Sequence, residues 1–203
     1  DRAREMVADI WKHGAFATPY GTLPTAVLEV NGDLLQVLSR LYWMTGEAQY
    51  RTWAFCLADY YLLQEPLVNL ERIPLRDHGC EVLGGLSEAY VIAARTDPAK
   101  HAAYRAPLHR LLDTILKHGV YDDGMMPNWF NPRTGEKAKG TLSDGWGYVY
   151  NAFLTVVIVD GHPSYRAAVM KALQRVHTHL GTNWENYTGD GYATDDFAGT
   201  LGA

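Results

Sequence analysis

The sequence predicts an all-α protein built from antiparallel helix hairpins. Apolar residues recur at spacings of three and four along most of the chain, the period of an α-helix with one buried face. The dipeptide Tyr-Arg occurs at Tyr50-Arg51, Tyr104-Arg105 and Tyr165-Arg166, and each time it opens a helical pattern. A short segment of turn composition precedes each of these helices, and another apolar helix precedes that segment. Repetition of this kind predicts stacked helix pairs.

The first helix of each pair is expected to begin at an aspartate close to a glycine. These helices are predicted over residues 33–44, 77–94 and 144–159. A carboxylate accepts hydrogen bonds from free backbone N–H groups, so Asp33, Asp77 and Asp144 are expected to cap them. An unpaired helix is predicted over residues 2–11, and Asp190 is expected to begin a fourth pair. Only residues 25–30 show a short extended pattern.

A polar stripe follows one face of the first helix in each pair, while the remaining faces are apolar. A helix with this pattern belongs in an inner layer, packed against outer helices and facing a shared wet cavity. The stripe residues are Asp33, Gln36 and Arg40 in the first pair, Asp77, Glu81, Gly84 and Glu88 in the second, and Asp144, Tyr148, Asn151 and Thr155 in the third.

This alternation of inner and outer helices over residues 32–203 resembles the six-hairpin glycosidase-like superfamily of glycoside hydrolases, polysaccharide lyases and sugar epimerases. The resemblance implies an all-α fold in which helix hairpins form an incomplete (α/α) toroid. Members of that superfamily usually have six helix pairs. We therefore expect residues 1–203 to be a single domain that is a fragment of a larger (α/α)6 toroid, or a chain that closes its toroid with another copy as a homo-oligomer.

The segment from Tyr121 to Leu154 begins as a long connection rich in Asp, Gly, Pro and Asn, and such connections often carry function. The connection ends in Asp144-Gly145-Trp146-Gly147-Tyr148, a stretch that resembles the loop that borders the sugar pocket in unsaturated glucuronyl and rhamnogalacturonyl hydrolases. It lacks the arginine that usually precedes the Gly-x-Gly-Trp stretch there. Aromatic rings stack on sugar faces, so Trp129, Trp146 and Tyr148 are candidate substrate-binding residues. The alternative is that they are packing aromatics.

Candidate catalytic groups lie at the starts of two inner helices. Glycoside cleavage needs a protonated carboxylic acid and a second carboxylate that activates water or attacks carbon. Asp77 and Asp144, from neighbouring helices, can supply that pair, and Glu81 lies one turn from Asp77 as a substitute. The alternative is that both aspartates only cap helices. His78 is a further candidate, as a proton donor, a base or a metal ligand, or as a hydrogen-bonded structural residue.

Other chemistry has less support in the sequence. Asp190 and Tyr192 are candidate substrate-binding residues at the fourth helix start. No metal site is expected, because His78 and Cys80 lack further ligands at zinc spacing and Asp122-Asp123-Gly124 fits a capped turn better than a calcium loop. No cofactor is expected either, since the sequence contains no dinucleotide, phosphate-loop or nucleophile-elbow motif.

Composition limits the partners. With 203 residues and 47% hydrophobic residues, the chain can bury a sizeable core. Its net charge of -5, without a basic cluster, argues against nucleic acid and anionic membranes as partners. The apolar run at residues 152–159 is far shorter than the roughly 20 residues that cross a bilayer.

Together these patterns favour a glycoside hydrolase that uses paired carboxylates in the cavity to act on an oligosaccharide or polysaccharide. A polysaccharide lyase or sugar epimerase on the same scaffold, with His78 or a nearby tyrosine as base, is the enzymatic alternative. A non-catalytic helical-repeat module that binds protein or glycan is the alternative from another class.

Overall fold

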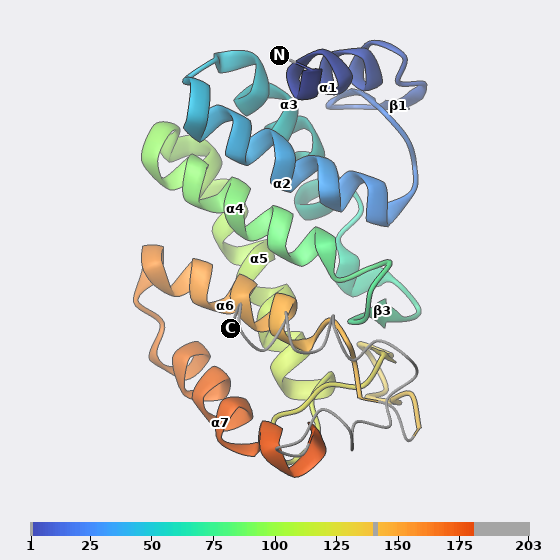
Figure 1. The fold of residues 1–203 in the computed structure, drawn as a ribbon, viewed down its shortest axis with the longest axis vertical. Helices are drawn as coiled ribbons and strands as arrows, with labels where there is room; N and C mark the ends of the chain where they lie inside the picture. Colours follow the sequence, from blue (N-terminus) through green and yellow to red (C-terminus); the bar gives the residue numbers. More distant parts are fainter. Residues whose placement is uncertain (1, 140–141, 181–203) are drawn as a thin grey trace.

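The computed structural model describes residues 2–139 and 142–180, which are mainly helical (Figure 1). A π-helical turn over Tyr60–Gln64 directly follows the helix that ends at Asp59, and a 3-10 turn spans Leu67–Asn69. The α-helices of this part of the chain are α1 (Arg2–Lys12), α2 (Leu28–Thr45), α3 (Ala48–Asp59), α4 (Glu81–Thr96), α5 (Pro98–His118), α6 (Trp146–Asp160) and α7 (Pro163–Leu180). The short strands are β1 (Phe16–Thr18), β2 (Gly21–Leu23), β3 (Ile73–Pro74) and β4 (Trp129–Phe130).

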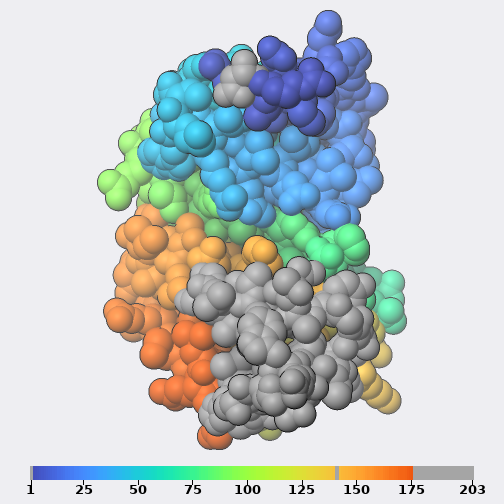
Figure 2. Space-filling view, viewed as in Figure 1, coloured from blue at the N-terminus to red at the C-terminus, as the bar shows by residue number. Residues whose placement is uncertain are grey.

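The helices form three consecutive hairpins, α2-α3, α4-α5 and α6-α7, each with its two helices in contact. The inner helix α4 packs between α2 and α6, so these three lie side by side, as Figure 1 shows. Along the long axis the hairpins follow chain order, from α1 to α3 at one end to α7 at the other (Figure 2). The predicted all-α class with paired inner and outer helices is therefore confirmed.

Glycine and proline define several of the helix ends. Gly46 and Gly161 adopt left-handed backbone conformations with φ of 72° and 63°, and their N–H groups close the last turns of α2 and α6. Pro98 occupies the first turn of α5, where its missing N–H costs nothing, and the Asp97 carboxylate accepts from the Lys100 N–H. Short turns follow, so each inner helix must fold back beside its outer partner.

The predicted starts of the inner helices were wrong in detail. Helix α2 begins at Leu28, so residues 28–30 of the extended pattern predicted over residues 25–30 are helical, and Asp33 lies more than a turn inside. The residues at the N-cap positions of α2, α4 and α6 are Val27, Cys80 and Gly145, and none donates or accepts a capping side-chain bond. Asp77 and Asp144 precede their helices in turns. None of the three aspartates therefore caps its own helix.

The repeated tyrosines are core residues of the outer helices. Tyr50, Tyr104 and Tyr165 are at most 1% exposed. They lie inside α3, α5 and α7, so the Tyr-Arg pairs do not mark the helix starts, which come earlier in the chain. The Tyr104 hydroxyl donates to Asp59 at 2.7 Å, and burial is the largest cause of its raised pKa. The repeated tyrosine thus marks the position at which each outer helix packs into the core.

No helix among the described residues has the length and hydropathy that a bilayer span requires.

Glycines allow α2 and α4 to approach within backbone contact. A Cβ atom on Gly32 would lie 2.4 Å from the Val82 backbone nitrogen, and one on Gly85 would lie 2.4 Å from the Leu35 Cβ and 2.8 Å from the Gly32 carbonyl oxygen. All three distances are far below van der Waals contact. Any larger residue would separate the two inner helices and shift their polar stripes relative to each other.

Replacing Gly32 tests this close packing. Gly32→Ala is expected to lower the free energy of unfolding by about 1 to 3 kcal/mol, the usual cost of overpacking, despite the better helix propensity of alanine. Gly84→Ala is the matched control, because its Cβ would meet only the flexible Gln36 amide at 3.4 Å. Urea denaturation of both variants measures the difference. Equal stability of the two variants would contradict the packing account.

Candidate functional site

One cavity of about 420 Å³ opens where the three inner helices meet. It joins groups from α2, from α4 with its preceding turn, and from α6 with its preceding turn. Predicted stripe residues from all three hairpins therefore share one space. The lining residues are Glu29, Asp33, Gln36, Arg40, Asp77, Cys80, Glu81, Asp144, Gly145 and Tyr148.

The turns before α4 and α6 are held together by hydrogen bonds between their backbones and side chains. The Asp77 N–H donates to Asp144 Oδ1 at 2.9 Å, and the Ser143 hydroxyl donates to the Leu75 carbonyl oxygen at 2.6 Å. Strands β3 and β4 pair antiparallel just outside these contacts. The Asp144 carboxylate therefore accepts a hydrogen bond from the turn before α4 instead of capping its own helix. This bond fixes the carboxylate at the cavity wall, where only 7% of the residue is exposed.

Glu81 is half-buried at the cavity, and one oxygen of its carboxyl group is inaccessible to solvent. Its Oε1 accepts from the His78 N–H at 3.2 Å, while Oε2 is buried without a hydrogen-bond partner among the described residues. Burial raises the pKa of Glu81 above its usual range, and the nearby Asp77 carboxyl acts in the same direction against the favourable effect of backbone N–H groups. This carboxyl group therefore stays protonated to a higher pH than an ordinary glutamate.

A second acidic pair comes from α2. Glu29 and Asp33 are four residues apart and share a helix face. Burial raises the pKa of Asp33, and the like charges of Glu29 and Asp77 raise it further. Glu29 was missed as a site residue because residues 25–30 were expected to be extended. Its place four residues before Asp33, in register with the polar stripe, was the available signal.

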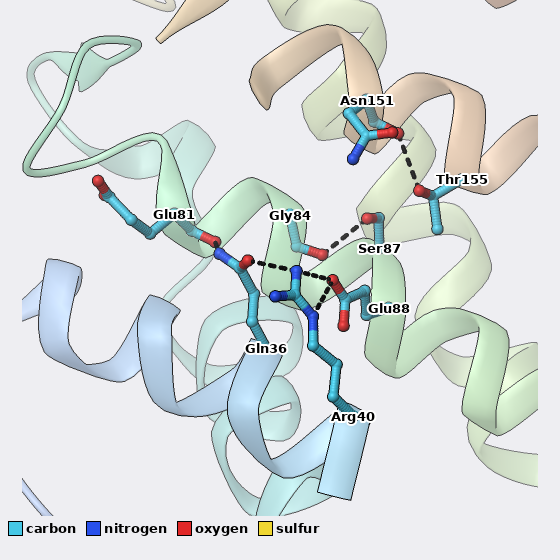
Figure 3. A network of polar contacts seen from close by, with 8 residues as sticks. All are labelled: Gln36, Arg40, Glu81, Gly84, Ser87, Glu88, Asn151 and Thr155. Atoms are coloured by element: carbon cyan, nitrogen blue, oxygen red, sulfur yellow. Dashed lines mark hydrogen bonds and ion pairs between the residues drawn. The ribbon is translucent and has the colours of Figure 1, made fainter. Parts of the chain in front are cut away.

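A chain of polar contacts closes the other end of the cavity between α2 and α4 (Figure 3). The Arg40 guanidinium donates to Glu88 Oε1 at 2.8 Å and to Gln36 Oε1 at 2.9 Å. The Gln36 amide in turn donates to the Glu81 carbonyl oxygen at 3.1 Å. In the same view Asn151 and Thr155 of α6 contact each other through the Thr155 hydroxyl, and neither lines the cavity.

His78 lies at the rim with an unusual backbone. Its φ of 70° is in the left-handed region, which a non-glycine residue adopts at a cost. The ring Nδ1 lies 2.7 Å from Glu29 Oε1, and Nε2 lies 3.6 Å from Asp77 Oδ2. The hydrogen bond to Glu29, followed by the charge of Asp77, raises the pKa of the imidazole. His78 thus connects α2 to the turn before α4.

The candidate aromatic residues fall into different environments. Tyr148 lines the cavity and is 52% exposed. Trp146 is fully buried in the core beside Tyr150, which is the environment of a packing aromatic. Two residues correspond to about 200° around a helix, which places Trp146 opposite Tyr148. Trp129, on β4, is half-buried beneath the Arg72 guanidinium at 4.0 Å and is not part of the cavity wall.

The structure thus brings Asp77, Glu81, Asp144 and Tyr148 together and leaves His78 at their edge. Asp190 and Tyr192 lie outside the described residues. Within the part of the chain that the structure describes, no three His, Cys, Asp or Glu side chains are arranged to hold one metal ion. The arrangement can transfer protons between the Glu81 carboxyl group, whose pKa is raised, and the fixed Asp144 carboxylate.

No family model matches the sequence, and no curated protein matches it. The fold is similar to that of cellobiose 2-epimerase from Spirochaeta thermophila DSM 6192, with a TM-score of 0.62 and 14% sequence identity. The match covers 98% of this chain and 64% of that structure, so the chain spans less than two thirds of the epimerase. At this identity the likeness shows the fold alone, an all-α fold similar to the toroid of that epimerase.

Glu81→Gln tests the environment of the Glu81 carboxyl group. The folded pKa of Glu81 lies above its ordinary value near 4.5, so ionisation favours unfolding and stability falls as pH rises from that value through the folded pKa. The glutamine side chain does not ionise, so the variant does not lose this stability as the pH rises. We expect its Tm to exceed that of the unchanged protein by about 1 to 4 °C at pH 8 and to match it at pH 4, in thermal unfolding followed by circular dichroism. A lower Tm at pH 8 would contradict the assignment.

Proposed function

We propose that the protein is a carbohydrate-active enzyme that hydrolyses glycosidic bonds with the carboxyl groups of this cavity. The observation that carries the proposal is the convergence of Asp77, Glu81 and Asp144, from two adjacent inner-helix starts, on one water-accessible space. One of the three has a raised pKa and another is fixed by a backbone hydrogen bond. Glycosidases use such a difference between two carboxyl groups.

In the proposed reaction Glu81 is the general acid. Its proton passes to the glycosidic oxygen as the bond from that oxygen to the anomeric carbon breaks. A water molecule attacks the anomeric carbon, and its proton passes to the carboxylate of Asp144 or Asp77. The hydrogen bond that the Asp77 N–H donates orients the Asp144 carboxylate for that role. Tyr148, half exposed four residues after Asp144, offers an aromatic surface and a hydroxyl to the sugar.

Sugar epimerisation is the second candidate, and the fold likeness to a cellobiose 2-epimerase favours it. That chemistry removes and returns a proton on a carbon beside a carbonyl group and therefore needs an unprotonated base, which can be an imidazole or a carboxylate. His78 is the nearest imidazole, but its contact with Glu29 favours the protonated form. Five acidic residues line the cavity. The pairing of Glu81, whose pKa is raised, with the fixed Asp144 carboxylate is the acid and base that glycoside cleavage uses, and it supports hydrolysis more than epimerisation.

Isotope incorporation separates the reactions. The protein is incubated with a panel of disaccharides and nitrophenyl glycosides in water enriched in oxygen-18, and in parallel in deuterium oxide. Hydrolysis places oxygen-18 on a released sugar. Epimerisation leaves the glycosidic bond intact and places deuterium on the carbon that changes configuration, and a lyase produces an unsaturated uronate that absorbs ultraviolet light. Glycan binding without any product would support the helical-repeat binding module instead.

Variants then test the assigned residues. Glu81→Gln and Asp144→Asn are each expected to lower kcat by about 10² to 10⁴, the usual contribution of general acid or base catalysis. Glu65→Gln is the control, because Glu65 is exposed and lies outside the cavity. Glycoside turnover in both cavity variants at the level of Glu65→Gln would refute the proposal.

A further inference from the structure

A network of polar side chains joins the α6–α7 hairpin to α4 and α5, and none of its members lines the cavity. His109 of α5 is at its centre, with Nε2 2.6 Å from Asp160 Oδ2 at the end of α6 and Nδ1 2.8 Å from the Tyr165 hydroxyl of α7. The Tyr90 hydroxyl of α4 donates to the same Asp160 oxygen at 2.9 Å. The Tyr165 hydroxyl donates to Asp113 Oδ1, also at 2.9 Å. One imidazole ring thus connects four helices.

The hydrogen atoms of this network do not match its contacts when the histidine is neutral and both aspartates are ionised. Each tyrosine hydroxyl supplies one hydrogen, a neutral imidazole supplies one, and a carboxylate supplies none. Three hydrogens then serve the four side-chain contacts found among the described residues. One pair of polar atoms would face each other at hydrogen-bonding distance with no hydrogen between them. One additional proton completes the network.

The surroundings place this proton on the His109 ring. Burial and the hydrogen bond to Asp113 raise the pKa of Tyr165. Burial and the hydrogen bond to Asp160 raise the pKa of Tyr90, so both hydroxyls keep their single hydrogen. Burial by itself would raise the pKa of Asp160, but the hydrogen bonds from His109 and Tyr90 outweigh it and lower that pKa, so Asp160 only accepts. Asp113 is exposed, and water stabilises its carboxylate. Both ring nitrogens of His109 therefore donate.

Other charged and titratable groups surround the ring. The charge of Arg105 helps to keep Asp160 ionised, although it opposes a second positive charge nearby. Asp160 is in direct contact with His109, and their side chains are only 6% and 16% exposed, so the attraction between them outweighs that repulsion. The groups near His109 outside the network are His101, Arg105, Arg110, Lys117 and His118 of α5 and His162 of the turn before α7.

We infer that His109 is a proton-dependent lock on the α6–α7 hairpin. As an imidazolium it donates to Asp160 and Tyr165 at once, and Tyr165 still donates to Asp113. When the ring loses one proton to solvent as the pH rises, the single Tyr165 hydrogen can serve only one of His109 and Asp113. The attachment of α7 to α5 then weakens. Because α6 forms one wall of the cavity, loosening of this hairpin reaches the candidate site.

Asp113→Asn separates the additional proton from the contacts. The asparagine amide can donate to the Tyr165 oxygen, so Tyr165 can donate to His109 Nδ1 and a neutral imidazole can donate to Asp160. All four contacts are then satisfied without the additional proton. Asp113 is exposed on α5, so this variant is expected to fold. His109→Gln removes the imidazole altogether.

Nitrogen-15 resonances of the imidazole rings at pH 7 report the protonation state. In the full chain we expect two protonated ring nitrogens in His109, and in Asp113→Asn one protonated nitrogen and one bare nitrogen. His109→Gln assigns the resonances by their loss. His118 is the internal reference for a neutral ring, because burial and the charges of Lys117 and Lys137 lower its pKa. A neutral His109 ring in the unchanged protein at pH 7 would overturn the inference.

Hydrogen exchange measures the lock itself. From pH 6 to pH 9, after correction for the intrinsic exchange rate, the protection of the α7 amides is expected to fall about tenfold in the unchanged protein and at most about twofold in Asp113→Asn. His109→Gln should give low protection at both pH values. His13→Gln, at an exposed histidine just after α1, is the matched control and should keep the pH dependence.

Two outcomes of the exchange experiment would count against the lock. Protection of α7 that does not fall with pH in the unchanged protein would overturn the inference, and so would an equal fall in Asp113→Asn. Neither measurement uses a substrate, so each result stands apart from the proposed hydrolysis of glycosides.

Discussion

The close approach of α2 to α4 determines the geometry of the site. Gly32 and Gly85 remove the side chains that would separate the two helices, so their backbones meet. At that separation the Gln36 amide reaches the Glu81 carbonyl oxygen and Arg40 reaches Glu88. A cavity wall built from short polar contacts across two rigid helices is better defined than one built on loops alone.

The turns before α4 and α6 complete that wall and explain its unequal carboxyl groups. Asp144 is nearly buried but accepts a backbone N–H, whereas one oxygen of Glu81 has no partner among the described residues. Gathering five acidic residues in one cavity costs folding free energy, because like charges repel and buried carboxylates lose hydration. The apolar packing of the three hairpins offsets that cost, as is usual where stability is exchanged for a functional site.

Much of the fold follows from hydrophobic periodicity. The spacing of three and four, the turn segments and the repeated Tyr-Arg pairs indicate helix hairpins because each hairpin must bury the apolar faces of its helices. The helix starts were less predictable. Aspartates near glycines resemble N-caps, but Asp33 lies within α2, and Asp144 accepts from Asp77, a residue 67 positions away. A contact of that range leaves no local signal in the sequence.

The sequence by itself determined the helical class, the pairing of helices and the polar stripes, because these depend on local period and on short connections. The tertiary structure decided which stripe residues meet. It turned Tyr148 to the cavity and Trp146 to the core, added Glu29, and left Asn151 and Thr155 outside the cavity wall. Which groups share a cavity, and how far burial and neighbouring charges move their pKa values, depends on distances between helices that sequence spacing does not contain.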